Sequence, residues 1–270
     1  MEVEKIQKKI PIELFHREII ESSWKKSNQS SFYHYFPLVY AISKSTEPLN
    51  FGQSYGDIFL DDIREIYIGG RDLEDALISD DIKKIWVVTR PPEIPQINYE
   101  VYDVNYILDL NETIGVKYFR KNAQRYSKDG RAQYSPEGSP EIAKEIVMNW
   151  YQKSFREEFT DFGYTMWLAE NYEMFPDLKA RFLYLNDKPV AFSLWGELSS
   201  KMAIHLICKD SVAQDYLQDY ARMMTYKEMV GDGFETVNDG SDCGEPGIRH
   251  FKLKLRPKYI VPIYSWVRKK

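Results

Sequence analysis

Three consecutive strands in the second half of the chain restrict its fold more than any other feature. Apolar residues predict them over residues 180–185, 189–198 and 201–208. The first turn is Asn186-Asp187 and the second is Ser199-Ser200. Strands joined by such short turns pair antiparallel, because parallel neighbours need a long crossover connection. The sequence therefore predicts a three-stranded antiparallel meander.

The elements around this meander do not alternate regularly. A strand over residues 102–110 and two helices precede it, the first predicted over 111–130. A long helix, a short strand, a second helix and a last strand follow it. This order excludes a β-sandwich and lacks the regular alternation of a doubly wound sheet. The second half is therefore predicted to be an α/β (α+β) domain with a mixed sheet flanked by helices.

Composition removes several classes of protein. The chain has 270 residues, of which 43% are hydrophobic and 29% charged, and its net charge is −5. An acidic balance argues against a duplex-DNA-binding protein. Two cysteines and four scattered histidines predict neither a disulfide framework nor a metal site. The chain shows no signal peptide and no apolar run of membrane-spanning length, so we expect a cytoplasmic protein.

Residues 238–257, NDGSDCGEPGIRHFKLKLRP, join a polar turn to a basic helix. Three glycines permit positive φ and the close approach of a ligand: Gly240, Gly244 and Gly247. Pro246 favours the first helical turn, whose free N–H groups attract anions. Arg249 and Lys252 share one side of this helix. The alternative interpretation is an ordinary capped turn followed by a solvated basic face.

A second basic group lies on the helix that follows Gly115. Four cations recur on one face: Lys117, Lys121, Arg125 and Lys128. Arg120 lies beside them, and aromatic residues such as Tyr118 are interspersed. Such a stripe predicts binding to the phosphates of tRNA, a nucleotide or a lipid. The alternative interpretation is a solvated helix face.

Three segments resemble the GCN5-related acyltransferase fold, and most closely the soluble catalytic domain of bacterial phosphatidylglycerol lysyltransferases. They are YILDLNETIGVKYFRKNAQRY with its Lys121-Asn122 pair, the hairpin YLNDKPVAFSLWGEL, and the turn and helix NDGSDCGEPGIRHFKLKLRPKY. The resemblance implies an acyltransferase-like domain over residues 106–270. It also suggests that residues 1–105 form a second, degenerate copy, so that the two are in tandem.

The resemblance implies an acyl or aminoacyl transferase with an amine or hydroxyl acceptor, carried by a small molecule, a lipid or a peptide. Acyl-CoA-dependent members bind the diphosphate in a glycine-rich turn, but this chain has no glycine between Gly196 and Gly231. Asp215 and Tyr216 would obstruct that turn, so aminoacyl-tRNA is the favoured donor and acyl-CoA the less favoured one. The alternative is an inactive member of the fold that binds an anionic ligand or a protein partner.

Site residues follow from the same segments. Transfer to an amine needs a group that accepts a proton, and we assign catalysis to Asp239 and Asp242, of which Asp239 ends a predicted strand. His205 lies within a strand and suits the core, and no Ser-His-Asp spacing is present. The residues expected to bind donor or substrate are Lys117, Arg120, Lys121, Asn122, Arg125, Gly240, Gly247, Arg249 and Lys252. No metal and no firmly bound cofactor are expected.

Overall fold

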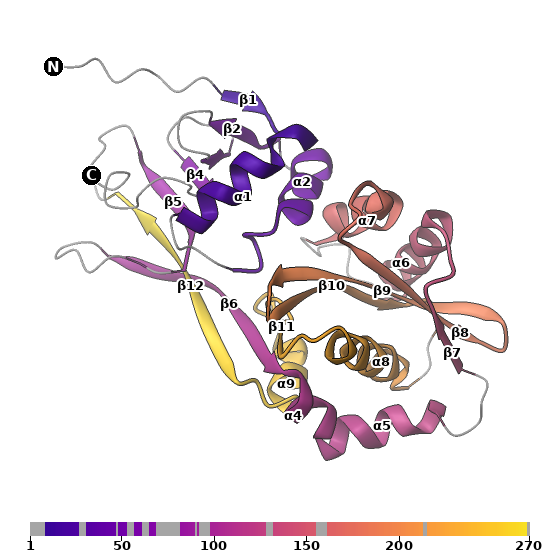
Figure 1. The fold of residues 1–270 in the computed structure, drawn as a ribbon. Helices are drawn as coiled ribbons and strands as arrows, with labels where there is room; N and C mark the ends of the chain where they lie inside the picture. Colours follow the sequence, from indigo (N-terminus) through magenta and orange to yellow (C-terminus); the bar gives the residue numbers. More distant parts are fainter. Residues whose placement is uncertain are drawn as a thin grey trace, which may run out of the picture. The chain divides into compact units, whose positions relative to one another are not determined.

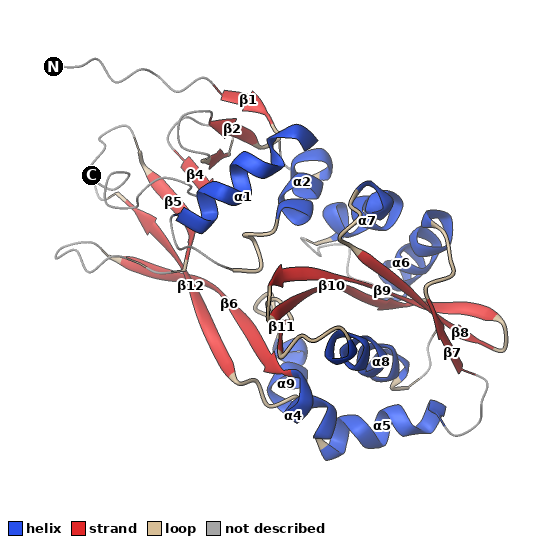
Figure 2. Cartoon of the chain, in the orientation of Figure 1, coloured by secondary structure: helices blue, strands red, loops and turns tan. Residues whose placement is uncertain are grey.

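The chain divides into two compact units in a computed structural model. The structure describes residues 9–26, 31–46, 48–52, 57–60, 65–68, 82–89, 91, 98–127, 132–154, 161–212 and 215–268. Unit 1 comprises Met1–Val104 and Val261–Lys270, and unit 2 comprises Asn105–Ile260. Two strands contain residues of both units: β6 (Tyr99–Asp109) and β12 (Tyr259–Val267). Each unit combines helices with a sheet (Figures 1 and 2). That unit 1 is a degenerate copy of unit 2 stays a prediction.

The described part of unit 1 combines helices with a sheet of short strands. Its helices are η1 (Leu14–His16), α1 (Arg17–Lys26) and α2 (Phe36–Ser45). Its strands, in sheet order, are β1 (Lys9–Pro11), β2 (Asn50–Gly52), β3 (Ile58–Phe59), β4 (Glu65–Ile68), β5 (Lys84–Val88) and β12. The pairing of β4 with β5 is parallel. Helix α2 is apolar on all sides, and its residues from Phe36 to Ile42 are accordingly buried.

Unit 2 contains the predicted meander within a mixed sheet. Its strands, in sheet order, are β6, β11 (Thr236–Asn238), β10 (Met202–Asp210), β9 (Lys188–Ser199), β8 (Lys179–Leu185) and β7 (Ala132–Ser135). β8, β9 and β10 pair antiparallel, whereas β10 and β11 are parallel. Asn186 and Asp187 have φ of 51° and 61°, as a tight hairpin turn requires. The predicted meander and its first turn are confirmed.

Helices cover both faces of the central strands of unit 2 (Figure 1). α6 (Pro140–Ser154) and α7 (Phe162–Asn171) lie on one side, and η2 (Tyr172–Met174) follows α7. α8 (Leu217–Gly231) lies on the other side and packs against α5 (Lys117–Ser127). Because both faces are covered, β9 is buried continuously from Val190 to Trp195. The predicted mixed sheet flanked by helices is confirmed.

The helix predicted over residues 111–130 is in fact two helices. α4 (Leu110–Gly115) begins after Asp109, whose carboxylate accepts a hydrogen bond from the Glu112 N–H at 3.1 Å. Val116 has an extended ψ of 119° and separates α4 from α5. The last helix, α9 (Pro246–Lys254), begins at Pro246 as predicted. Within the described residues, no helix has both the length and the apolar character needed to span a bilayer.

Candidate functional site

Strands β10 and β11 diverge in the middle of unit 2. Their parallel pairing ends at Ile204 and Asn238. Beyond Asn238 the chain stays with β6, because the Asp239 N–H donates to the Tyr106 carbonyl at 2.9 Å. β10 contains a bulge directly after His205. Polar side chains from β10, α8 and α9 meet at this divergence.

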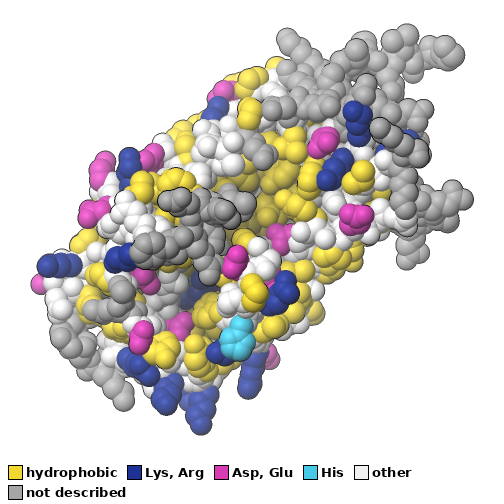
Figure 3. Space-filling view, turned by 180° about the vertical axis from the view of Figure 1, so that it is seen from behind, with side chains coloured by type: hydrophobic (Ala, Val, Ile, Leu, Met, Phe, Trp, Pro, Cys, Tyr) yellow, Lys and Arg dark blue, Asp and Glu magenta, His cyan; other side chains and the backbone are white. Residues whose placement is uncertain are grey.

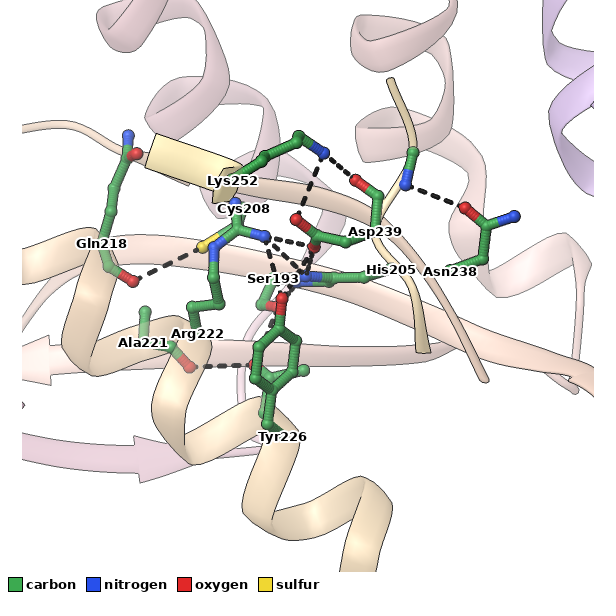
Figure 4. Close-up of polar contacts among 12 residues, drawn as sticks. Ser193, His205, Cys208, Gln218, Ala221, Arg222, Tyr226, Asn238, Asp239 and Lys252 are labelled. Atoms are coloured by element: carbon green, nitrogen blue, oxygen red, sulfur yellow. Dashed lines mark hydrogen bonds and ion pairs between the residues drawn. The ribbon is translucent and has the colours of Figure 1, made fainter. Parts of the chain in front are cut away.

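The buried carboxylate of Asp239 is the centre of this polar group (Figure 4). Its Oδ1 accepts hydrogen bonds from the Arg222 guanidinium and, at 2.8 Å, from the Tyr226 hydroxyl. His205 Nδ1 lies 3.1 Å from the same oxygen. The Lys252 ammonium lies 3.2 Å from Oδ2 and also donates to the Asp239 backbone carbonyl. We call Ser193, His205, Arg222, Tyr226, Asp239 and Lys252 the Asp239 cluster.

The two cations determine the ionisation of this cluster. Burial alone would raise the pKa of Asp239, but the charges of Arg222 and Lys252 hold that pKa well below its usual value. Burial lowers the pKa of His205, although the hydrogen bond to Asp239 opposes this effect. His205 is therefore a neutral ring at neutral pH, and Asp239 is a poor proton acceptor. This geometry suits a positioning role for Asp239.

Ser193, His205 and Asp239 are connected in the order of a catalytic triad. Ser193 Oγ lies 2.9 Å from His205 Nε2, whose other ring nitrogen faces Asp239. However, Ser193 is buried and its hydroxyl also lies 2.9 Å from Thr225 Oγ1. This burial separates the hydroxyl from an acyl donor. The three residues form a buried hydrogen-bond chain, not a nucleophilic site.

Asp242 holds the turn that precedes α9. Its Oδ2 accepts from the Tyr106 hydroxyl at 2.6 Å and from Arg249 Nε at 2.7 Å, and its Oδ1 accepts from the Gly244 N–H at 2.9 Å. Burial would raise the pKa of Asp242, but these donors lower it. The Asp242 side chain is 2% exposed, whereas that of Arg249 is 55% exposed. Asp242 therefore orients Arg249 at the surface.

The glycine-rich turn uses positive φ at two of the three predicted glycines. Gly240 has φ of 70° and Gly244 of 74°, and Cys243 between them has φ of 52°. Gly247 lies in the first turn of α9 and does not use this freedom. A Cβ at Gly247 would meet no atom within 4 Å. The surface there is open, which is compatible with a ligand.

The predicted basic stripe lies exposed on α5. Its described cations are Lys117, Arg120, Lys121 and Arg125, whereas Lys128 lies outside the described residues. Among the described residues, no carboxylate lies within ion-pair distance of these four cations. Lys254 of α9 extends the stripe, because its Nζ lies 4.9 Å from the centre of the Tyr118 ring. Figure 3 shows Lys and Arg side chains gathered along the lower edge of the molecule, where α4 and α5 lie.

Asn122 differs from the other predicted binding residues because it is buried. Its Nδ2 donates to Asp219 Oδ2 of α8 at 2.7 Å. Burial raises the pKa of Asp219, and the hydrogen bond from Asn122 opposes that rise. The Asn122 amide therefore joins α5 to α8 and does not face solvent.

Replacing Asn122 with alanine is expected to lower the free energy of unfolding by about 1–3 kcal/mol, because the buried Asp219 carboxylate loses a donor. Urea denaturation at neutral pH measures this loss. Lys121→Ala, at the exposed neighbouring position, is the control and should stay within about 0.5 kcal/mol of the wild type. Equal stability of the two variants would contradict the structural role of Asn122.

The turn before α8 is covered by α5. Tyr216 caps α8 in the left-handed conformation, with φ of 66°. The Tyr126 hydroxyl donates to the Asp215 carbonyl at 2.7 Å, and the Arg125 guanidinium lies 4.3 Å from the centre of the Tyr216 ring. Asp219 lies in the first turn of α8, where a bound anion would otherwise be favoured. This arrangement supports the expectation that a diphosphate does not bind here in the usual manner.

Several residues of the site were not predicted. Arg222 and Tyr226 are among them, although one signal was present: Asp219, Arg222 and Tyr226 recur at i, i+3 and i+7 on one face of α8. Asp210, the last residue of β10, is a further carboxyl that the sequence did not single out for catalysis. Burial raises the pKa of Asp210 to about 6, with Lys153 and Gln218 opposing the rise. Within the described ranges, no group of three or more histidines, cysteines or carboxylates is placed to hold a metal ion.

Solved structures share this fold, among them the following three. A conserved protein of unknown function from Bacteroides thetaiotaomicron VPI-5482 has a TM-score of 0.77 at 16% identity, covering 97% of this chain and 100% of that chain. The DUF2156 C-terminal domain of a protein assigned as lysylphosphatidylglycerol synthetase from Agrobacterium fabrum has a TM-score of 0.62 at 15% identity, covering 94% and 93%. L-PGS from Bacillus licheniformis has a TM-score of 0.63 at 16% identity, covering 94% and 92%.

These likenesses show the fold. The chain shares its fold with the lysylphosphatidylglycerol synthetase C-terminal domain and with L-PGS, as its sequence predicts. No protein-family model and no curated protein sequence matches the chain. The roles of the individual site residues stay predictions.

Proposed function

We propose that the protein transfers an activated aminoacyl group from aminoacyl-tRNA to an amine or hydroxyl acceptor. The fold supports acyl or aminoacyl transfer in general, because one protein of similar fold is assigned as a lysylphosphatidylglycerol synthetase. The acceptor is a small molecule, a lipid or a peptide. The donor follows from features of unit 2 itself.

The observation that carries the proposal is the exposed basic stripe of α5. Lys117, Lys121 and Arg125 are spaced at four-residue intervals, so they span about 12 Å along the helix. Lys254 places a further cation beside them. A row of cations of this length, without carboxylate partners among the described residues, suits a polyanion. RNA supplies such a polyanion, and its aminoacyl ester supplies the activated acyl group.

The turn before α8 disfavours the other donor. Acyl-CoA requires backbone N–H groups that approach a diphosphate closely. Here Tyr216 carries a side chain at that turn, and α5 covers it through Tyr126 and Arg125. Asp215 and Asp219 add negative charge. A donor held by the α5 stripe fits these residues better than coenzyme A.

We assign different chemical roles to the polar residues where β10 and β11 diverge. Asp239 keeps Lys252 and the following turn in place, and Asp242 keeps Arg249 in place. Arg249 is the exposed guanidinium that we assign to the oxyanion of the tetrahedral intermediate. Proton acceptance falls to a different carboxyl, because Asp239 and Asp242 are both held ionised by their donors. We assign that task to Asp210, because it ends β10, the strand that carries His205, and because burial raises its pKa to about 6.

A transfer assay tests the proposal. The protein is incubated with tRNA charged with labelled amino acids and with three acceptor types: a small amine, phospholipid vesicles and a peptide. The readout is label that leaves tRNA and appears in the acceptor. Arg249→Ala is expected to lower the rate by about 100-fold, a typical loss when one oxyanion donor is removed. Lys201→Ala, an exposed lysine of unit 2, removes the same charge and should keep the wild-type rate.

The hydrogen bonds that Asp239 and Asp242 already accept favour one alternative function. In this alternative the protein is an inactive member of the fold that binds an anionic ligand. Both predicted catalytic aspartates accept hydrogen bonds from several donors. Binding of tRNA without transfer to any of the three acceptors would support this alternative. Turnover with acetyl-CoA and none with charged tRNA would replace the proposed donor.

A further inference from the structure

A lysine ammonium in unit 2 is enclosed by two aromatic rings and a carboxylate. Lys209 Nζ lies 3.5 Å from the centre of the Trp150 ring and 5.1 Å from that of Tyr151. It also lies 3.3 Å from Asp161 Oδ2. The Lys209 and Asp161 side chains are only 14% and 22% exposed. We call Trp150, Tyr151 and Asp161 the ammonium cage, because proteins bind ammonium groups with such residues.

The cage lies on the opposite face of β10 from the Asp239 cluster. Trp150 and Tyr151 belong to α6, whereas Arg222 and Tyr226 belong to α8, and these helices cover opposite faces (Figure 1). Lys209 therefore plays no part in the hydrogen bonds of the Asp239 cluster. The cage is therefore a separate group of residues, and the transfer proposed above assigns no role to it.

The contacts of Lys209 leave part of the cage unused. Asp161 Oδ1 is buried and receives no hydrogen bond of normal geometry from the described residues, although the Tyr151 hydroxyl interacts with the Asp161 side chain. A primary ammonium has three N–H donors. Asp161 Oδ2 accepts one of them, and Asp161 Oδ1 is available to accept a second. Burial lowers the pKa of Lys209, and Asp161 opposes this effect. The Asp161 carboxylate therefore offsets part of the loss of hydration of an ammonium held in the cage.

The cage lies near the glycine-rich turn. Lys209 is the penultimate residue of β10, at the end where β10 has left β11. Cys243 of the turn interacts electrostatically with both Lys209 and Tyr151. Cys243 is exposed. These electrostatic interactions with Cys243 are the reason for placing a substrate of the turn beside the cage.

We propose that Trp150, Tyr151 and Asp161 bind a primary ammonium group of the substrate, and that Lys209 occupies this site when substrate is absent. One ammonium replaces another, so the ion pair and the cation–π contacts are kept during the exchange. The ammonium comes from the α-amine of the donor's aminoacyl group or from the acceptor. Only the identity of this ammonium depends on the proposed transfer; the binding site itself does not.

Titration with small amines tests the exchange. Alaninamide carries the ammonium of an aminoacyl group, ethylamine represents an acceptor amine, and N-acetylalaninamide lacks the charge. Binding is followed by tryptophan fluorescence and checked by ligand-observed NMR, at a pH that keeps the amines protonated. In Lys209→Met the internal occupant is gone, so alaninamide or ethylamine should bind with a Kd at least about tenfold lower than in the wild type. The tighter of the two amines identifies the source.

The double variant Lys209→Met/Asp161→Asn is the matched control and should lose this binding. N-acetylalaninamide should bind none of the proteins. Equal Kd values in the wild type and Lys209→Met, or no saturable binding to either, would overturn the proposal and leave Lys209 a structural bridge between α6 and β10. If circular dichroism shows that Lys209→Met does not fold, Lys209→Gln takes its place. No tRNA or turnover is involved, so the proposed transfer and this site can fail independently.

Discussion

Replacing Asp239 with asparagine is expected to lower the free energy of unfolding by about 3–5 kcal/mol, the usual cost of breaking a buried ion pair from one side. The reason is that Arg222 and Lys252 would stay buried without the carboxylate that compensates them. Their side chains are only 14% and 7% exposed, so water replaces it poorly. Urea denaturation at neutral pH, followed by circular dichroism, measures the loss.

The pH dependence identifies the carboxylate as the cause. The pKa of Asp239 is lower in the folded than in the unfolded protein, so its ionisation stabilises the fold above the unfolded pKa of about 3.9. That contribution is lost as the pH falls below this value. The stability difference between wild type and Asp239→Asn should therefore shrink below about pH 4. Asp187→Asn, in an exposed turn, is the control, and a difference that stays constant with pH would contradict this account.

The sequence predicts the local parts of unit 2 well. The meander, the turn at Asn186-Asp187 and the start of α9 at Pro246 depend on residues close together in the chain. Their physical causes are alternation of apolar residues, turn propensity and the fixed φ of proline. The basic stripe of α5 is equally local, because helical spacing alone places its cations on one face.

The sequence does not predict which polar residues become buried. Asp239 was singled out because it ends a strand, where catalytic residues are common, and Asp242 because it lies in the polar turn that follows. Their environments depend on Arg222 of α8 and on Tyr106 of β6, and Tyr106 lies 136 residues from Asp242. Helical spacing predicts which face of α8 carries Arg222, but it does not predict the ion pair between Arg222 and Asp239. The burial of Asn122 was not foreseen for the same reason, because its partner Asp219 lies on another helix.

The combined variant Lys117→Ala/Lys121→Ala/Arg125→Ala is expected to weaken tRNA binding on the order of 100-fold near physiological salt. Each lost phosphate contact removes the release of about one counterion, and three such losses multiply. The slope of log affinity against log salt should accordingly fall by about 2–3. Fluorescence anisotropy of labelled tRNA over a range of salt concentrations measures both quantities. All three side chains are exposed, so thermal stability should change little.

The matched control separates position from charge. Lys25→Ala/Lys26→Ala/Lys188→Ala removes the same three charges from exposed sites outside the stripe. Because both triple variants have the same net charge, only the stripe variant should lose affinity beyond a small general effect. Equal losses in the two variants would show that net charge, not the α5 surface, controls binding. Arg249→Ala should show the opposite behaviour, with tRNA affinity kept and transfer lost, because we place Arg249 at the reacting ester and the α5 stripe at the phosphates.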